Sequence, residues 1–170
     1  MEPVLFRSNL ETPVGVVQLA VDADGVLVEI RLPNRGPASA SRTPLPIAAD
    51  AGTQAASVQL SEYFLGKRRA FDLRLAPRGS PFEQSVWTRL ASIPYGTTTS
   101  YGAIAAELGL LNGARAVGRA NGANPLPIII PCHRVIGMDG QLTGYGGGLP
   151  LKRALLELEG AIPPPDPRLL

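Results

Sequence analysis

The chain has 170 residues, of which 45% are apolar and 18% are charged, and its formal net charge is +2. This length allows one large or two small domains with a buried core, and the composition excludes global disorder. The charge excess is too small to establish a polyanionic partner by itself. A single cysteine, Cys132, and a single histidine, His133, exclude an internal disulfide and a zinc site built from cysteines and histidines.

The sequence contains no segment suited to a membrane or to export. Its longest wholly apolar stretches are far too short to span a bilayer. The first residues lack the basic, apolar and small-residue regions of a secretory signal. We therefore expect a soluble, cytoplasmic protein with no membrane partner, in which Cys132 stays reduced.

The first part of the chain has the pattern of a small α+β unit. Residues 3–32 alternate as strands do, and the Asp24-Gly25 pair between two runs indicates a hairpin turn, because glycine accepts a positive φ. Four prolines among residues 33–47 indicate a loop, and residues 48–65 have helical spacing. We expect the apolar face of this helix to contain Ala55, Val58, Leu60, Phe64 and Leu65. A further strand is expected to contain Phe71, Leu73 and Leu75.

The second part of the chain is expected to be helical. Ser80 followed by Glu83 forms a capping box that starts one helix, and Ser100 can cap a second helix that runs through Leu108. After a short connection, residues 114–122 read as a third helix. A helix, a short turn and a helix form the pattern of a DNA-binding helix-turn-helix, although α domains are also simply built this way.

The third helix has small side chains. The sequence ARAVGRANGA over residues 114–123 contains two glycines, each of which costs roughly 1 kcal/mol relative to alanine inside a helix. Small side chains allow another surface to come close, and the two arginines could neutralise phosphates. A thin helix packed tightly on a neighbour explains the same composition. Both interpretations stay open.

The most informative segment is PLPIIIPCHRVI at residues 125–136. A lone buried cysteine is usually inert core. Here, however, the only imidazole of the chain, His133, and then Arg134 follow Cys132 directly, and a nearby base or positive charge makes a thiol nucleophilic. Because neighbouring side chains of an extended segment point to opposite faces, a turn or a bridging water would have to connect His133 with the thiol.

A partner for the histidine is expected at the end of the last helix. Glu157 and Glu159 lie in the last turn, where the helix dipole disfavours a carboxylate. We therefore expect one of them to be paired, although a solvated turn could tolerate both. Between the thiol and this helix, residues 137–148 include six glycines and Tyr145. This loop could close over a planar ligand, with the tyrosine as a stacking face, or could be only a connection.

Together these segments resemble the O6-alkylguanine-DNA alkyltransferases, also called methylated-DNA–protein-cysteine methyltransferases. The similarity covers residues 80–160 and is carried by the following motifs: Pro131-Cys132-His133-Arg134-Val135, Ser100-Tyr101, Ala114-Arg115-Ala116-Val117-Gly118, Asn124-Pro125, Thr143-Gly144-Tyr145 and Leu156-Glu157-Leu158-Glu159-Gly160. It implies an α+β fold. Residues 1–76 would form a domain with a small antiparallel sheet and a helix. Residues 77–160 would form a helical domain with a winged-helix-like helix-turn-helix. Four prolines among residues 161–170 separately indicate a disordered tail.

The resemblance implies direct DNA repair by a single, irreversible transfer of an alkyl group from O6 of guanine, or from O4 of thymine, to Cys132. His133 resembles the general base that works through a water, and Glu159 the carboxylate that orients it. Asn124 resembles the buried amide that ties the thiol segment to the helix-turn-helix. The implied partner is double-stranded DNA that carries O6-alkylguanine. No cofactor, metal or obligate protein partner is implied, and we expect a monomer.

The resemblance also implies a set of substrate and DNA contacts. Arg115 resembles the finger that fills the place of the flipped base, and Tyr101 the group that hydrogen-bonds guanine N3. The carbonyls of Cys132 and Val135 and the N–H of Gly146 are expected to face the edge of the base. The same set includes Asn121, Tyr145 as a wall of the pocket, and Lys152 as a support of its rim.

One departure and two alternatives accompany this interpretation. Relatives often carry Ala or Ser at the position of Gly146, so we expect a less crowded pocket that handles bulky alkyl groups better. Alkyltransferase-like proteins bind DNA lesions without repairing them, but they lack the thiol that this chain has at Cys132. A cysteine hydrolase that uses Cys132, His133 and Glu159 is disfavoured because it would need turnover and a base from a distant segment.

Overall fold

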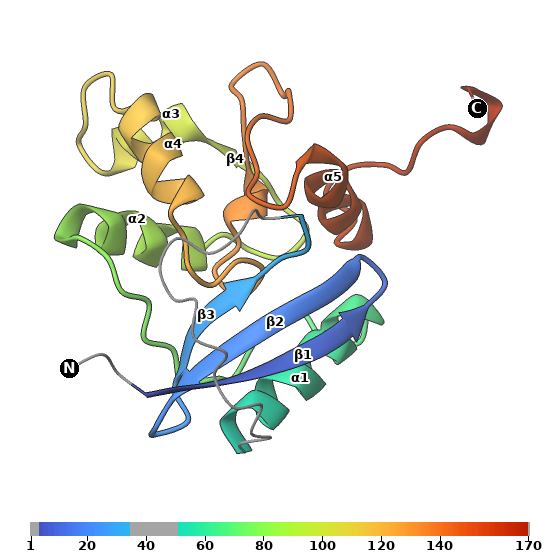
Figure 1. The fold of residues 1–170 in the computed structure, drawn as a ribbon. Helices are drawn as coiled ribbons and strands as arrows, with labels where there is room; N and C mark the ends of the chain where they lie inside the picture. The colour runs from blue at the N-terminus through green and yellow to red at the C-terminus, as the bar shows by residue number, and fades with distance from the viewer. Residues whose placement is uncertain (1–3, 35–50, 170) are drawn as a thin grey trace.

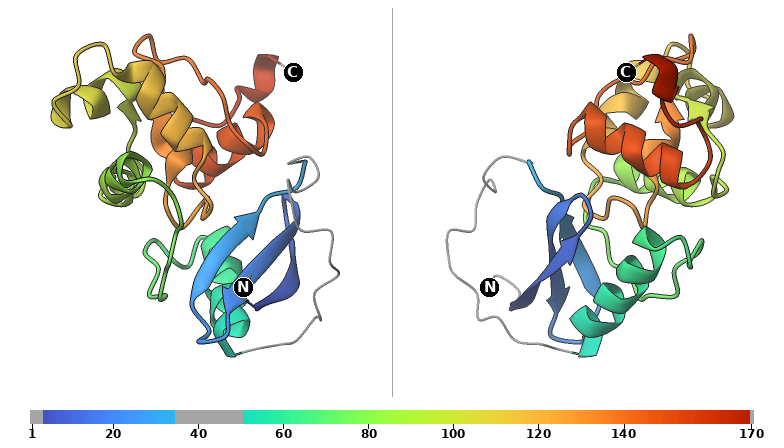
Figure 2. Two further views of the ribbon diagram at one scale, coloured as in Figure 1. Left: turned by 60° about the vertical axis from the view of Figure 1, so that its left-hand side comes forward. Right: turned by 90° about the vertical axis from the view of Figure 1, so that its right-hand side faces the viewer.

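The computed structural model describes residues 4–34 and 51–169, and these residues form the expected α+β fold. A three-stranded sheet with one helix on one face lies beside a group of four further α-helices (Figures 1 and 2). No helix among the described residues is long and apolar enough to cross a membrane. The elements are β1 (Leu5–Thr12), β2 (Gly15–Asp22), β3 (Leu27–Arg31), α1 (Ala51–Phe64), α2 (Pro81–Ala91), β4 (Thr99–Ser100), α3 (Tyr101–Glu107), α4 (Ala114–Gly122), η1 (Cys132–Arg134), β5 (Val135–Ile136), α5 (Leu149–Leu158) and η2 (Pro167–Leu169), where η marks a 3₁₀ helix.

The sheet is antiparallel with the order β1-β2-β3. The predicted hairpin turn joins β2 to β3, and Gly25 there has a φ of +73° that favours glycine. The side chain of Asp22 accepts the N–H groups of Asp24 and Val26, each at 3.0 Å. The loop predicted over residues 33–47 and the first three residues of the predicted helix lie almost entirely outside the described residues.

The buried face of α1 differs from the predicted one. Val58 and Leu65 are 52% and 65% exposed, so the predicted apolar face was wrong in part. The buried stripe consists of Leu60, which was predicted, and of Thr53, Ala56 and Tyr63, which were not. The four residues follow helical spacing, but Thr53 and Tyr63 are polar and Ala56 is small, so hydrophobicity did not reveal these three.

The strand expected over residues 71–75 was also wrong. Phe71 and Leu73 are half-buried and their neighbours are exposed, which explains the alternation in the sequence. The segment nevertheless pairs with the sheet only through a single bridge between Leu75 and Leu27. Packing of alternate side chains against the core therefore produced a strand-like pattern over residues 71–75, although only Leu75 pairs with a strand.

The helical part follows the predicted caps. The Ser80 side chain accepts the N–H of Glu83 at 3.2 Å, and the Glu83 carboxylate accepts the N–H of Ser80 at 2.8 Å. Ser100 caps α3 in the predicted way. The helices α3 and α4 pack against each other as a helix-turn-helix, and the indole N–H of Trp87 on α2 donates to the carbonyl of Ala120 on α4 at 2.8 Å. This bond fixes α4 on the body of the molecule.

The two parts of the chain are connected close to the thiol segment. The N–H of Ile30 in β3 donates to the carbonyl of Pro125 at 2.8 Å, and the Leu32 side chain would lie within 3.1 Å of a Cβ at Gly147. The last described residues, 163–169, extend away from the body and end in the short turn η2 (Figure 1). The predicted domain limits and the disorder of the tail stay predictions.

Candidate active site around Cys132

A cavity of about 540 Å³ opens between the helix-turn-helix and the glycine-rich loop, and Cys132 is in its wall. Gly118 and Gly122 of α4 also line it, as does Leu32 from the end of the sheet. The predicted site residues that line the cavity are Tyr101, Arg115, Asn121, Asn124, Cys132, Tyr145 and Gly146. The structure therefore brings together most of the predicted binding residues. His133, Val135, Lys152 and Glu159 do not line the cavity and are buried.

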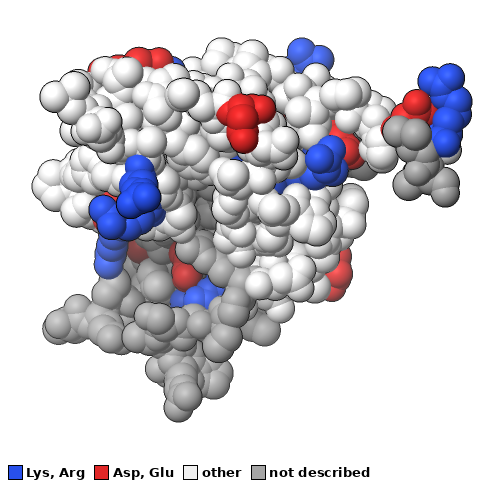
Figure 3. All heavy atoms as spheres, turned by 90° about the horizontal axis from the view of Figure 1, so that it is seen from above, with Lys and Arg blue, Asp and Glu red and all other residues white. Residues whose placement is uncertain are grey.

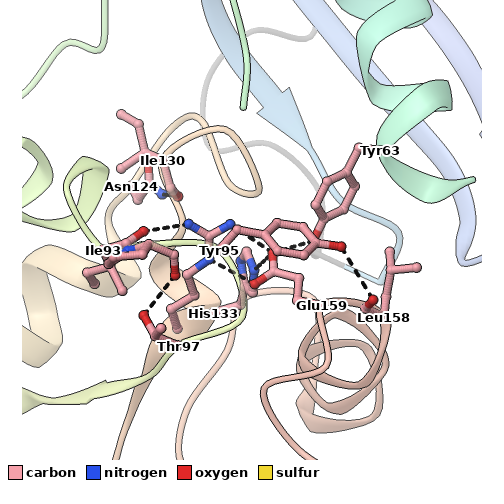
Figure 4. A network of polar contacts seen from close by, with 11 residues as sticks. Tyr63, Ile93, Tyr95, Thr97, Asn124, Ile130, His133, Leu158 and Glu159 are labelled. Atoms are coloured by element: carbon pink, nitrogen blue, oxygen red, sulfur yellow. Dashed lines mark hydrogen bonds and ion pairs between the residues drawn. The ribbon is translucent and has the colours of Figure 1, made fainter. Parts of the chain in front are cut away.

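Two asparagines hold the segment that carries the thiol. Asn124 donates from Nδ2 to the carbonyl of Ile130 at 2.8 Å (Figure 4). Its Oδ1 accepts the N–H of Leu126 at 2.9 Å. Asn121 donates from Nδ2 to the carbonyl of Cys132 at 3.3 Å. Asn121 lies in α4 and Asn124 lies just beyond its C-terminal end, so both side chains tie the thiol segment to the helix-turn-helix. Cys132 begins the 3₁₀ turn η1, so a turn, and not an extended segment, carries the Cys-His pair.

The expected partner of His133 is Glu159. The Nε2 atom of His133 lies 2.7 Å from Oε1 of Glu159, and both side chains are buried (Figure 4). Arg134 donates to both carboxylate oxygens, at 2.8 and 2.9 Å, and also to the carbonyl of Ile93. The hydroxyl of Tyr63 on α1 donates to Oε1 of Glu159 at 2.7 Å. The expectation that one of the two glutamates is paired is therefore confirmed.

These contacts set the charges of the pair. Burial alone raises the pKa of Glu159, but the hydrogen bonds from His133, Arg134 and Tyr63 outweigh it and lower this pKa to about 2. Burial lowers the pKa of His133 more than the carboxylate raises it. A neutral imidazole beside an ionised carboxylate donates from Nε2, which leaves the lone pair on Nδ1. That buried Nδ1 has no hydrogen-bond partner among the described residues and is the available base.

Lys152 does not line the cavity itself but binds Thr143, a residue of the cavity wall. Its side chain is buried, and Nζ donates to the carbonyl of Val135 at 2.6 Å and to that of Thr143 at 2.8 Å. Burial lowers the pKa of Lys152 to about 8, and the charge of Cys132 acts in the opposite direction. The Tyr101 hydroxyl donates to the same carbonyl of Thr143 at 3.2 Å. Lys152 therefore joins β5 to the glycine-rich loop.

The sequence interpretation missed some residues of the site. Tyr63 and Leu32 come from the first part of the chain, which showed no chemistry in its sequence. A tyrosine on the buried stripe of a helix needs a partner for its hydroxyl, and this was the available signal. Arg134 was noted only as a positive charge, whereas it binds the carboxylate. Among residues 4–34 and 51–169, no group of three or more Cys, His, Asp or Glu side chains could hold a metal.

We expect Glu159→Gln to destabilise the fold strongly, because Arg134 would remain buried without a counter-charge. The expected loss at neutral pH is about 3–5 kcal/mol of unfolding free energy. The folded-state pKa of about 2 lies below the ordinary value of 4.5, so the stabilisation by Glu159 is present above pH 4.5 and is lost as the pH falls toward 2. Urea unfolding at several pH values should therefore show a difference between wild type and variant that shrinks over this interval.

Glu157→Gln is the matched control, because Glu157 lies near the same helix end and has only a loose 3.8 Å pair with Arg153. We expect it to change the unfolding free energy by no more than about 0.5 kcal/mol. Equal losses in the two variants would contradict a central role for Glu159.

Comparison with known proteins agrees with this geometry. Residues 81–161 match the family model of the 6-O-methylguanine DNA methyltransferase DNA-binding domain. The methylated-DNA–protein-cysteine methyltransferase of Mycobacterium tuberculosis is 47% identical over 165 residues, which cover 96% of this chain and 97% of the relative. The relative from Methanosarcina acetivorans is 42% identical over an alignment that covers 92% of this chain and 99% of the relative.

Solved structures give the same result. A crystal structure of Mycobacterium tuberculosis OGT in complex with DNA has a TM-score of 0.82 and 47% identity, and it covers 92% of this chain and 93% of the other. A crystal structure of the O6-methylguanine methyltransferase of the same organism has a TM-score of 0.83 and 46% identity, with 97% and 98% coverage. The cavity, the buried histidine–glutamate pair and these similarities lead to one conclusion: the chain belongs to the methylated-DNA–protein-cysteine methyltransferases.

Proposed function

We propose that this chain repairs DNA directly, by moving an alkyl group from O6 of guanine to Sγ of Cys132. One observation carries the proposal: the only thiol of the chain, Cys132, lies in the wall of a base-sized cavity. The next residue, His133, forms a buried pair with Glu159. The relatives with this name give the reaction class. Each molecule reacts once, because the thioether formed on Cys132 is stable.

The transfer is a displacement at the alkyl carbon. The thiol proton of Cys132 passes through a water to Nδ1 of His133, and Glu159 stabilises the imidazolium that forms. Sγ then forms a bond to the alkyl carbon, the bond from this carbon to O6 breaks, and its electron pair stays with guanine. When the base binds, the Tyr101 hydroxyl turns from the carbonyl of Thr143 to guanine N3, and this hydrogen bond offsets the developing charge. The positive charge of Lys152 near the thiol favours the thiolate.

The target base must leave the duplex, because the thiol cannot reach O6 in a stacked pair. The composition of α4 supports a close approach of DNA. A Cβ at Gly122 would meet no atom within 4 Å, and one at Gly118 only the ring of Tyr101 at 3.8 Å. Packing on neighbouring helices therefore does not require these glycines, although Val117 and Ala120 on the same helix are buried. Arg115 is exposed at the cavity and fills the vacated place in the stack.

The chain binds DNA, and the partner we propose is a duplex with O6-alkylguanine, bound by a monomer. Figure 3 looks onto the end of the molecule where α3, α4 and the glycine-rich loop lie. Lys and Arg form small separate groups on this face rather than one continuous basic field. Recognition of the lesion therefore depends on the cavity and on α4 more than on bulk charge.

The proposal is tested by the mass of the intact protein after incubation with an oligonucleotide that carries O6-methylguanine. We expect one stable gain of a methylene mass, and no gain for Cys132→Ser, which should still bind the oligonucleotide. Tight binding of the wild type without any gain would instead indicate a non-catalytic lesion-binding protein. Repeated turnover of a small ester or amide would indicate a hydrolase.

Arg115→Ala tests the role of the finger. We expect the rate on duplex DNA to fall about tenfold, since extrusion of the base loses its support, and the rate on free O6-benzylguanine to stay close to wild type. Arg119→Ala is the matched control, because it removes the same charge from an exposed position of α4 that does not line the cavity. Equal losses of the Arg115 variant on both substrates would exclude the finger role.

Gly146→Ser tests the less crowded pocket. A side chain at this position of the cavity wall occupies space that a bulky alkyl group would use. We expect the ratio of the rates on O6-benzylguanine and O6-methylguanine to fall about tenfold in the variant. Rate measurements on matched oligonucleotides check this, and an unchanged ratio would contradict it.

A further inference from the structure

The first part of the chain reaches the catalytic pair through one side chain. Tyr63 belongs to α1, is buried, and donates its hydroxyl to Oε1 of Glu159 at 2.7 Å. The same oxygen accepts Nε2 of His133 at 2.7 Å. Figure 4 shows the tyrosine entering from α1 on one side of the carboxylate, opposite the end of α5. A residue far from the thiol segment in sequence therefore shares an acceptor atom with the proposed general base.

We propose that Tyr63 is a positioning residue for alkyl transfer, which holds the Glu159 carboxylate in place and limits the negative charge that Oε1 presents to His133. This inference rests on the proposed function, because it concerns the base that would deprotonate Cys132. It gives the N-terminal part of the chain a role in the chemistry of the thiol.

The arrangement of donors supports a role beyond packing. Arg134 already contacts both carboxylate oxygens, so the charge of Glu159 has a partner without the tyrosine. The Tyr63 hydroxyl adds a donor to the oxygen that serves His133 and therefore competes with the imidazole for its electron density. Burial and then the nearby carboxylate raise the pKa of Tyr63. The phenol thus remains a hydrogen-bond donor throughout the working pH range.

The other charged and titratable groups around the Glu159 carboxylate come from η1, from α5 and from Tyr95. Arg134 and His133 face it from η1, and Lys152 acts on the imidazole from α5. Tyr95 lies beside this group: the guanidinium of Arg134 is 5.6 Å from its ring centre, and the ring of Tyr63 meets it edge-on at 6.3 Å. The Tyr95 hydroxyl donates to the carbonyl of Leu158 at 3.4 Å and does not contact the carboxylate.

Removal of the phenol has a defined electrostatic consequence. Without this donor, Oε1 carries more negative charge and stabilises the imidazolium form of His133 better. The pKa of His133, which burial holds below its ordinary value, then rises. A larger fraction of the imidazole is protonated near neutral pH and cannot accept the thiol proton. The acid limb of the rate profile, which belongs to the coupled Cys132–His133 pair, therefore moves to higher pH.

The test compares Tyr63→Phe with Tyr95→Phe in the full chain. The two rings pack against each other, and each variant keeps its ring and loses one hydroxyl, but only Tyr63→Phe loses a hydrogen bond to Glu159. Rates of alkyl transfer would be measured between about pH 5.5 and pH 9 on a methylated duplex and on free O6-benzylguanine. We expect Tyr63→Phe to lose roughly three- to tenfold at the acid end on both substrates and to recover at the alkaline end. Tyr95→Phe should keep the wild-type profile.

The outcomes separate a positioning role from a structural one. If Tyr63→Phe lowers the melting temperature but leaves the pH profile equal to that of Tyr95→Phe, Tyr63 only packs and the inference is overturned. If Tyr63→Phe does not fold, site-specific replacement of Tyr63 by 3-fluorotyrosine keeps the hydroxyl and makes it a stronger donor. The acid limb should then move to lower pH, and an unmoved limb would overturn the inference. Failure of the wild type to become alkylated would reject the proposed function instead.

Discussion

The buried carboxylate of Glu159 is the interaction on which the rest of the site depends. A charge removed from water is tolerated only when it is paired and fully hydrogen-bonded. Here the donors come from η1 and from α1, whereas Glu159 itself is the residue that ends α5. One ionised group therefore connects the thiol turn, the last helix and the N-terminal part of the chain. Its low pKa keeps the carboxylate ionised, and this fixes the direction in which the imidazole donates.

The second constraint joins this chemistry to the helix-turn-helix. Asn121 and Asn124 hold the backbone around Cys132 from α4 and from just beyond its end, and Tyr101 begins α3. On the other side of the cavity, Lys152 holds the carbonyls of Val135 and Thr143 together. The elements that belong to DNA binding in this family thus also form the walls of the cavity around the thiol. In the proposed reaction, the contacts that place the target base would therefore also set the reactivity of the sulfur.

The parts of the structure that could be predicted from the sequence are those that local rules determine. The turn at Gly25 and the caps at Ser80 and Ser100 depend on neighbouring residues alone. The buried stripe of α1 and the single bridge between Leu75 and the sheet depend on what lies across the core, which no local pattern shows. Tyr63 stayed unnoticed for the same reason, because its partner lies ninety-six positions later in the chain. The burial of the Lys152 ammonium likewise depends on the carbonyls of Val135 and Thr143, which lie on separate segments.

The protonation state of His133 tests the central claim most directly. His133 is the only histidine of the chain, so selective ¹⁵N labelling gives a single pair of ring-nitrogen signals without assignment. At neutral pH, in the absence of DNA, the neutral tautomer with its proton on Nε2 and a bare Nδ1 is expected. A proton on Nδ1, or an imidazolium at the same pH, would contradict a site in which the ionised Glu159 holds Nε2 and leaves Nδ1 as the base.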